Sequence, residues 1–216
     1  SFFSQYGKQI IANFVSLNKV KDQIQEKANF APFLTKLQKG FPLDASDYEI
    51  ICKEIYNKNY DDVQLGALLV LISEKSLYPD SLAALVKNIL KYSTTYSDNS
   101  QMIDIVGTGG DALKTINIST TVSFILAALG VKVAKHGNKA ITSKSGSSDI
   151  LSQIGINLDS NIEHLKSKLN EQNLAFFHAP YFHPITACVR DVRLRLGIGS
   201  VFNILGPLLN PNLNLS

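Results

Sequence analysis

Apolar side chains recur every three to four positions along the chain up to residue 92, a period typical of amphipathic helices. The predicted helices begin at Pro32, Ser46, Asp61 and Pro79. In the second of them, Ser46 and Glu49 have the spacing of a capping box, in which each side chain bonds the other residue's backbone N–H. Ser160 and Glu163 have the same spacing at the start of a later predicted helix. The stripes predict a helical region whose apolar faces form a core.

The pattern changes after residues 93–101, which are polar and show neither the helical nor the strand period. Short apolar runs at residues 102–106, 131–134 and 174–177 predict strands, and residues 119–129, 147–154, 160–172 and 184–196 predict helices. Strands that alternate with helices are typical of a mostly parallel, doubly wound α/β sheet. Three strands are few for such a sheet, so we expect the α/β part to be incomplete, its C-terminal portion missing.

Composition excludes several classes of protein. The chain has 216 residues, 45% hydrophobic and 18% charged, which excludes a disordered chain. The net charge of +3 is too small to indicate a dedicated nucleic-acid or membrane surface, and no apolar run approaches the roughly 18 residues of a membrane span. The lone cysteines Cys52 and Cys188 form no disulfide framework, so we expect a cytoplasmic protein.

A glycine-rich segment follows the first predicted strand. It contains Gly107, Gly109 and Gly110, and residues 117–120 (NIST) then open a helix. Glycines let backbone N–H groups approach an anion, and a helix N-terminus adds unpaired donors. No Asp or Glu occurs at residues 112–148, although five lysines do. The segment therefore predicts a phosphate site.

Better-known phosphate loops fit this segment poorly. Gly107, Gly109 and Ala112 match the dinucleotide pattern G-x-G-x-x-A, but the expected ribose-binding acid about 20 residues later is absent. Lys114 lacks the preceding Gly of a Walker loop. Neither G-x-S-x-G nor H-E-x-x-H occurs, which disfavours hydrolases that depend on those motifs.

Two further polar segments belong to the same predicted edge of the sheet. Residues 135–138 (KHGN) follow the second strand, and residues 143–147 (SKSGS) lead into the next helix. Open α/β sheets bind ligands at the carboxyl ends of their strands. Both segments are therefore candidates for ligand contact, although either could be an ordinary polar turn.

These motifs in this order resemble the anthranilate phosphoribosyltransferases. The resemblance rests on GTGGD at 107–111, NIST at 117–120, KHGN at 135–138, SKSGSSD at 143–149, His183-Pro184, Arg193 with LGI at 196–198, and FNILGP at 202–207. It extends over residues 31–216 and implies a helical domain (31–92 and 184–197) plus an α/β domain (101–183 and 198–216), here truncated. The implied reaction transfers a phosphoribosyl group from phosphoribosyl pyrophosphate to anthranilate with Mg²⁺.

The resemblance also implies site residues. Those implied for substrate are Gly107, Gly110, Asp111, Thr115, Asn117, Ile118, Ser119, Thr120, Lys135, His136, Gly137, Asn138, Ser143, Ser147, His183 and Arg193. Ser119 is implied as a Mg²⁺ ligand, and Arg193 is the natural partner of the anthranilate carboxylate. His136 and His183 line the same region, where a structural role is the alternative, and no residue is assigned as a catalytic acid or base.

The chain departs from the family pattern in three places. Ala112 stands where the family usually has Gly, and Gly199-Ser200 stands where Arg-Thr is usual. The family's metal-holding Asp-Glu pair belongs to the portion that we expect to be missing. The pair Asp61-Asp62 cannot replace it, because it lies at a predicted helix start.

The first 20 residues are similar to the closing helix of class I glutamine amidotransferases. We therefore interpret residues 1–20 as the tail of an upstream amidotransferase domain, which would bring an anthranilate synthase large subunit as a partner. The resemblance also implies a homodimer through the helical domain. Two alternatives stay open: a pyrimidine nucleoside phosphorylase, and a nucleic-acid-binding, non-catalytic relative.

Overall fold

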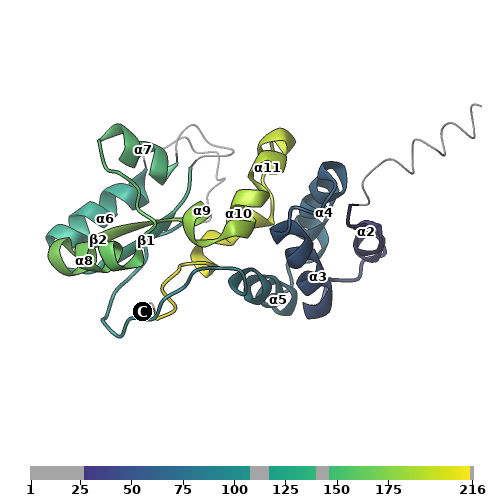
Figure 1. The fold of residues 1–216 in the computed structure, drawn as a ribbon, viewed down its shortest axis with the longest axis horizontal. Helices are drawn as coiled ribbons and strands as arrows, with labels where there is room; N and C mark the ends of the chain where they lie inside the picture. Colours follow the sequence, from purple (N-terminus) through teal and green to yellow (C-terminus); the bar gives the residue numbers. More distant parts are fainter. Residues whose placement is uncertain (1–26, 108–116, 140–145, 215–216) are drawn as a thin grey trace, which may run out of the picture.

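The computed structural model describes residues 27–107, 117–139 and 146–214. Four helices lie at one end of the molecule and a small sheet with its helices at the other, and shorter helices lie between them (Figure 1). The four helices are α2 (Ala31–Gln38), α3 (Ala45–Tyr56), α4 (Asp62–Lys75) and α5 (Pro79–Leu90). The predicted amidotransferase tail, residues 1–20, lies outside the described residues.

The apolar stripes of these helices meet in one core, as the spacing predicts. Leu65, Leu68 and Leu69 of α4 are at most 2% exposed. They pack in one cluster with Leu37 of α2 and Ile89 of α5. The helix α4 lies at the centre of this cluster, because both α2 and the later helix α11 (Arg190–Leu196) pack against it.

The predicted capping residues are wrong by one or two positions. Asp44, not Ser46, caps α3: its carboxylate accepts hydrogen bonds from the backbone N–H groups of Ser46 (2.9 Å) and Asp47 (3.1 Å). Likewise Asn161, not Ser160, caps α8 (Ile162–Gln172). A carboxylate or amide oxygen competes well with a nearby hydroxyl for the free N–H groups of a helix start.

The sheet has two described strands, β1 (Val133–Gly137) and β2 (Leu174–His178), which pair in parallel. The prediction for β2 is confirmed, and β1 begins two residues later than predicted. The prediction of a strand at residues 102–106 is wrong. These residues form only a single bridge, between Ile103 and Val133.

Helices cover both faces of this sheet. Phe176 of β2 contacts Phe124 of α6 (Ile118–Ala128), with ring centroids 5.6 Å apart. Its neighbour Phe177 packs with Leu165 and Leu169 of α8. Because successive side chains of a strand point to opposite faces, α6 and α8 lie on opposite sides. The fold is the predicted mixed helical and α/β arrangement with a partial parallel sheet.

The remaining helices include some that the sequence pattern missed. The predicted helix 184–196 is two helices, α10 (Pro184–Cys188) and α11, separated by Val189 with ψ near −4°. The missed elements are α9 (Ala179–Phe182), α12 (Val201–Ile204) and the 3₁₀ turn η1 (Gly206–Leu208). The helix α7 (Ser147–Gln153) is confirmed. Among the described helices, none is long and apolar enough to cross a membrane.

The segment after α11 contacts both regions of the molecule. Val201, Leu205 and Leu209 pack in the helical core. The side chains of Asn210 and Asn212 instead bond residues of the α/β region. This segment therefore connects the helical core to the sheet.

Candidate functional site

The structure places part of the predicted phosphate site at the start of α6. Asn117 precedes the helix, and its side chain makes no capping bond to any described residue. The first-turn N–H groups of α6 are thus left without a side-chain cap within the described chain, as an anion site requires. Ser119 is half-buried and Thr120 is buried, whereas Ile118 and Gly107 are exposed. Gly110, Asp111, Thr115 and Ser143 lie outside the described residues.

The end of β1 carries two buried ionisable side chains, Lys135 and His136, each 3% exposed. The Lys135 ammonium donates to the Ile105 carbonyl, with Nζ and O 2.5 Å apart. Burial lowers the pKa of Lys135, and the charge of Asp104 opposes this. Lys135 therefore holds the backbone that enters the glycine segment.

Asp104 is a site residue that the sequence analysis missed. It accepts hydrogen bonds from the His136 backbone N–H (3.1 Å) and from the Asn210 amide (2.8 Å). Burial raises the pKa of Asp104, and these hydrogen bonds oppose that rise. An acidic residue just before the glycines was a visible signal, but no local pattern indicated Asn210 as its partner.

Two buried histidines, His136 and His183, meet edge to face with ring centroids 5.3 Å apart. The Nδ1 atom of His136 lies 3.0 Å from the Gly206 carbonyl, and that of His183 lies 2.7 Å from the Ser93 hydroxyl. Burial lowers their pKa values to about 3 and about 4, so both rings are neutral at pH 7. Each Nε2 atom lacks a hydrogen-bond partner among the described residues.

The next two predicted residues, Gly137 and Asn138, lie against the start of α7. The Asn138 carbonyl accepts from the Ser147 hydroxyl (3.4 Å) and from the Ser148 backbone N–H (3.3 Å). A Cβ atom at Gly137 would collide with the Ser147 hydroxyl, so a side chain at this position would displace that hydroxyl. The structure therefore brings Ser147 to the carboxyl end of β1, as the motifs predict.

Arg193 of α11 is 6% exposed, and no carboxylate of the described residues pairs with it. Its guanidinium donates to the Asn203 side-chain oxygen (3.1 Å) and lies 5.4 Å from the centre of the Phe202 ring. Burial lowers its pKa to about 10, so it stays charged at pH 7. A buried cation without a counter-charge is costly and indicates a site for an anionic group.

A magnesium site does not follow from the described side chains. In the described ranges, no group of three His, Cys, Asp or Glu residues could hold a metal ion. The implied ligand Ser119 has no carboxylate hydrogen-bonded to it in those ranges, so these residues alone do not fit a protein-held Mg²⁺ ion.

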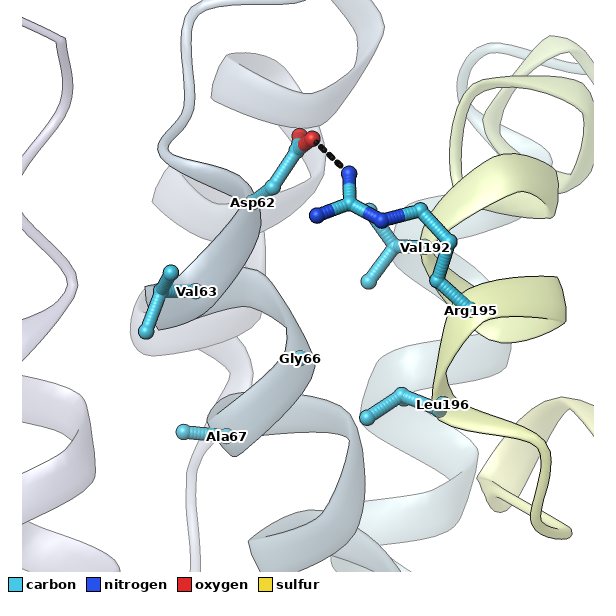
Figure 2. Close-up of a pocket in the computed structure, with 7 residues that line it drawn as sticks. All are labelled: Asp62, Val63, Gly66, Ala67, Val192, Arg195 and Leu196. Atoms are coloured by element: carbon cyan, nitrogen blue, oxygen red, sulfur yellow. Dashed lines mark hydrogen bonds and ion pairs between the residues drawn. The ribbon is translucent and has the colours of Figure 1, made fainter.

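A separate pocket of about 290 Å³ lies between α4 and α11. Figure 2 shows Asp62 and Arg195 at one end of it, joined by an ion pair of 2.7 Å, with Gly66, Val192 and Leu196 below. The pocket contains none of the predicted site residues. Asp61 caps α4, and Asp62 pairs with Arg195, so both carboxylates have the structural roles expected at a helix start.

Comparison with known proteins identifies relatives of this chain. The sequence model described as "Glycosyl transferase family, a/b domain" matches residues 99–215. The anthranilate phosphoribosyltransferase of Dictyoglomus turgidum is 39% identical over 179 residues, which are 83% of this chain and 53% of that protein. The chain thus spans about half the length of the curated relatives it matches.

Solved structures agree with the sequence comparison. The crystal structure of anthranilate phosphoribosyltransferase from Thermus thermophilus is similar with a TM-score of 0.71 and 34% identity, covering 83% of this chain and 55% of that one. The Saccharomyces cerevisiae enzyme in complex with PRPP and Mg gives 0.72 and 28%, covering 85% and 55%. The chain therefore belongs to the glycosyl transferase family, and the relatives that it resembles there are anthranilate phosphoribosyltransferases.

Proposed function

We propose that the protein to which this chain belongs transfers the phosphoribosyl group of phosphoribosyl pyrophosphate to the amine of anthranilate. The products are N-(5-phosphoribosyl)anthranilate and pyrophosphate, in tryptophan biosynthesis. The observation that carries the proposal is Arg193, a buried cation with no carboxylate partner in the described chain. Anthranilate supplies a carboxylate that a guanidinium binds through two hydrogen bonds, and its ring suits the neighbouring Phe202.

The diphosphate is proposed to bind at the first turn of α6 and the end of β1. The uncapped N–H groups after Asn117 supply donors, and Ser147 adds a hydroxyl. When pyrophosphate leaves the sugar, negative charge grows on its oxygens, and fixed donors in a site shielded from water stabilise that charge. Gly110, Asp111, Thr115 and Ser143 complete the proposed site.

On the side of the site that binds anthranilate, we propose that the histidine rings stay neutral and that the protein mainly positions the amine. His136 and His183 are neutral at pH 7 because burial lowers their pKa values. Because these rings are neutral, Arg193 supplies the positive charge for the substrate carboxylate. An aromatic amine needs little activation, so holding it against the sugar carbon supplies much of the rate increase.

We propose that Mg²⁺ is bound mainly by the phosphate oxygens of the substrate. The yeast relative was solved with PRPP and Mg. Phosphate oxygens are the ligands that Mg²⁺ prefers, and the ion neutralises charge on a diphosphate. Ser119 is proposed as one protein ligand of this substrate-bound ion.

Replacing Arg193 by Met tests the proposal. We expect the KM for anthranilate to rise at least about 30-fold, because removing one partner of a buried charged contact costs about 2–5 kcal/mol. The KM for phosphoribosyl pyrophosphate should change little. Both constants can be measured by following anthranilate fluorescence in the complete protein.

Arg195→Met is the matched control. Arg195 lies on the same helix, but its side chain is exposed and paired with Asp62. Equal effects of Arg193→Met on both substrates, or an effect matched by Arg195→Met, would reject the assignment. Phosphorolysis of thymidine by the complete protein would instead favour the phosphorylase alternative.

The assembly is also a proposal. We propose a cytoplasmic homodimer joined through the helical region, which exposes apolar side chains such as Val63 and Ile50. The upstream amidotransferase and an anthranilate synthase large subunit complete the proposed partners. Light scattering that gives a monomer at micromolar concentration would contradict the dimer.

A further inference from the structure

The pairing of Ile103 with β1 stops after one bridge, although the next residues are apolar. The Ile103 N–H donates to the Lys132 carbonyl (3.0 Å), and the Ala134 N–H donates to the Ile103 carbonyl (2.9 Å). In a parallel ladder the following pair would be Ile105 with Lys135. That pair would join the Ile105 N–H to the Ala134 carbonyl and the His136 N–H to the Ile105 carbonyl.

Side chains occupy three of the four backbone groups of this missing pair. The Ala134 carbonyl accepts from the Asn210 amide (2.8 Å), and the Ile105 carbonyl accepts from the Lys135 ammonium (2.5 Å). The Asp104 carboxylate accepts from the N–H group of His136 (3.1 Å). Since these three backbone groups are already satisfied by side chains, continuing the strand would gain little.

Two of the three side chains also bond each other, and the third is attracted to them by charge, so we treat the three as a unit. We call Asp104, Lys135 and Asn210 the rung bracket. Asn210 donates to Asp104 (2.8 Å) as well as to Ala134, and the charges of Asp104 and Lys135 attract each other. Lys135 and Asn210 are at most 6% exposed, so water competes little for these bonds.

The rung bracket is anchored by the segment that follows it. The Asn210 side-chain oxygen accepts from the Asn212 N–H (2.9 Å), and the Asn212 amide donates to the Met102 sulfur (2.8 Å). The Tyr96 N–H donates to the Pro211 carbonyl (3.0 Å). The end of the described chain is thus tied to the segment that leads into Gly107.

We propose that Asp104 and Asn210 are positioning residues that hold residues 105–107 off the edge of β1, with Lys135 as the third arm of the bracket. Formation of the missing pair would draw Ile105 onto β1 and shift Gly107, two residues further along the chain. The bracket therefore sets where the glycine segment starts relative to the helix N-terminus. This role rests on the proposed function, because its effect is on the binding of phosphoribosyl pyrophosphate.

Asp104→Val removes the carboxylate and introduces a strand-forming side chain. In the complete protein we expect the KM for phosphoribosyl pyrophosphate to rise on the order of tenfold, with the KM for anthranilate little changed. Asp104→Asn keeps one acceptor for the His136 N–H and should recover part of this loss. Asn210→Ala should fall between these two variants.

Asn88→Ala is the control for a loss of stability alone. Asn88 is a buried amide of the helical core that donates to the Ala45 and Ala84 carbonyls, as Asn210 donates to two buried acceptors. It should lower the unfolding temperature without raising the KM for phosphoribosyl pyrophosphate selectively. If Asp104→Val and Asn88→Ala change both KM values alike, the positioning role is overturned.

A second measurement does not depend on activity. In the 216-residue chain, NMR couplings across hydrogen bonds should show no bond from the His136 N–H to the Ile105 carbonyl, and that bond should appear in Asp104→Val. A coupling already present in the unsubstituted chain, or absent from the variant, would overturn the bracket. If the complete protein transfers no phosphoribosyl group, the proposed function fails, and this measurement alone decides the bracket.

Discussion

The helical core and the α/β region bury different kinds of polar group. In the helical core, the buried hydroxyls of Tyr48, Ser76 and Ser81 bond one another at distances of 2.6–3.3 Å. In the α/β region, the buried polar side chains include Lys135 and His136, which can carry charge. Neutral hydroxyls that satisfy each other cost little to bury, whereas ionisable groups cost much more.

This difference supports the proposed placement of the site in the α/β region and the segment that joins it to the helices. Buried ionisable groups persist where a ligand or a mechanism needs them. The site proposed above contains four of them: Lys135, His136, His183 and Arg193. In the helical core the buried groups are explained by packing and by hydrogen bonds between neighbours.

Acid is expected to have the largest effect on the free energy of unfolding, because the buried histidines that it protonates lie on the α/β side. Burial lowers the pKa of His136 to about 3 and those of His178 and His183 to about 4. The unfolded chain, with histidine pKa values near 6.5, binds these protons first. Stability is therefore full above about pH 6.5 and falls as the pH drops toward 4, by up to about 1.4 kcal/mol per pH unit for each histidine.

Urea unfolding at pH 7, 6 and 5 measures this slope. His178→Asn should reduce it by the share of one histidine. His164→Gln, which replaces a histidine whose side chain is 69% exposed, is the control variant. A free energy of unfolding that is equal at pH 7 and pH 5 would contradict the burial of neutral histidines.

A cavity in the helical core should lower the free energy of unfolding without changing the binding of pyrophosphate. Leu68→Ala removes a side chain that is 0% exposed, and we expect the free energy of unfolding to fall by about 3 kcal/mol. The Kd for inorganic pyrophosphate, measured by calorimetry where the variant is folded, should not change. Val63→Ala on the same helix is the control, because Val63 is exposed. A cost below about 1 kcal/mol would mean that this core is loosely packed.

The smallest expected effect concerns a turn of the helical region. Lys58 has φ near +56°, a left-handed conformation in which a side chain is strained. Lys58→Gly should raise the free energy of unfolding by about 0.5–1 kcal/mol, because relief of this strain outweighs the added freedom of the unfolded chain. Lys53→Gly, within α3, should lower it by a similar amount, and thermal unfolding can compare the two. Lower stability of Lys58→Gly would contradict the strain.

Much of the fold follows from patterns within a few residues of each other. The spacing of apolar side chains in α4 and α5 predicts which face of each helix is buried. Pro79 marks a helix start, and Gly130 marks a helix end. Gly130 has φ near +86°, which glycine adopts without strain. Helix identity was therefore predictable, whereas the capping residues of α3 and α8 were not, since neighbouring polar groups compete for the same N–H groups.

Contacts between distant residues decided the rest. The run after Met102 has the composition of a strand, yet Lys135 and Asn210, far along the chain, take the hydrogen bonds that a strand would use. The motif predicted a role for Arg193, but its burial without a carboxylate partner in the described residues arises from the packing of α11. Local periodicity encodes which elements form, whereas the partner of a buried polar group depends on which segments folding brings together, and neither spacing nor composition contains that information.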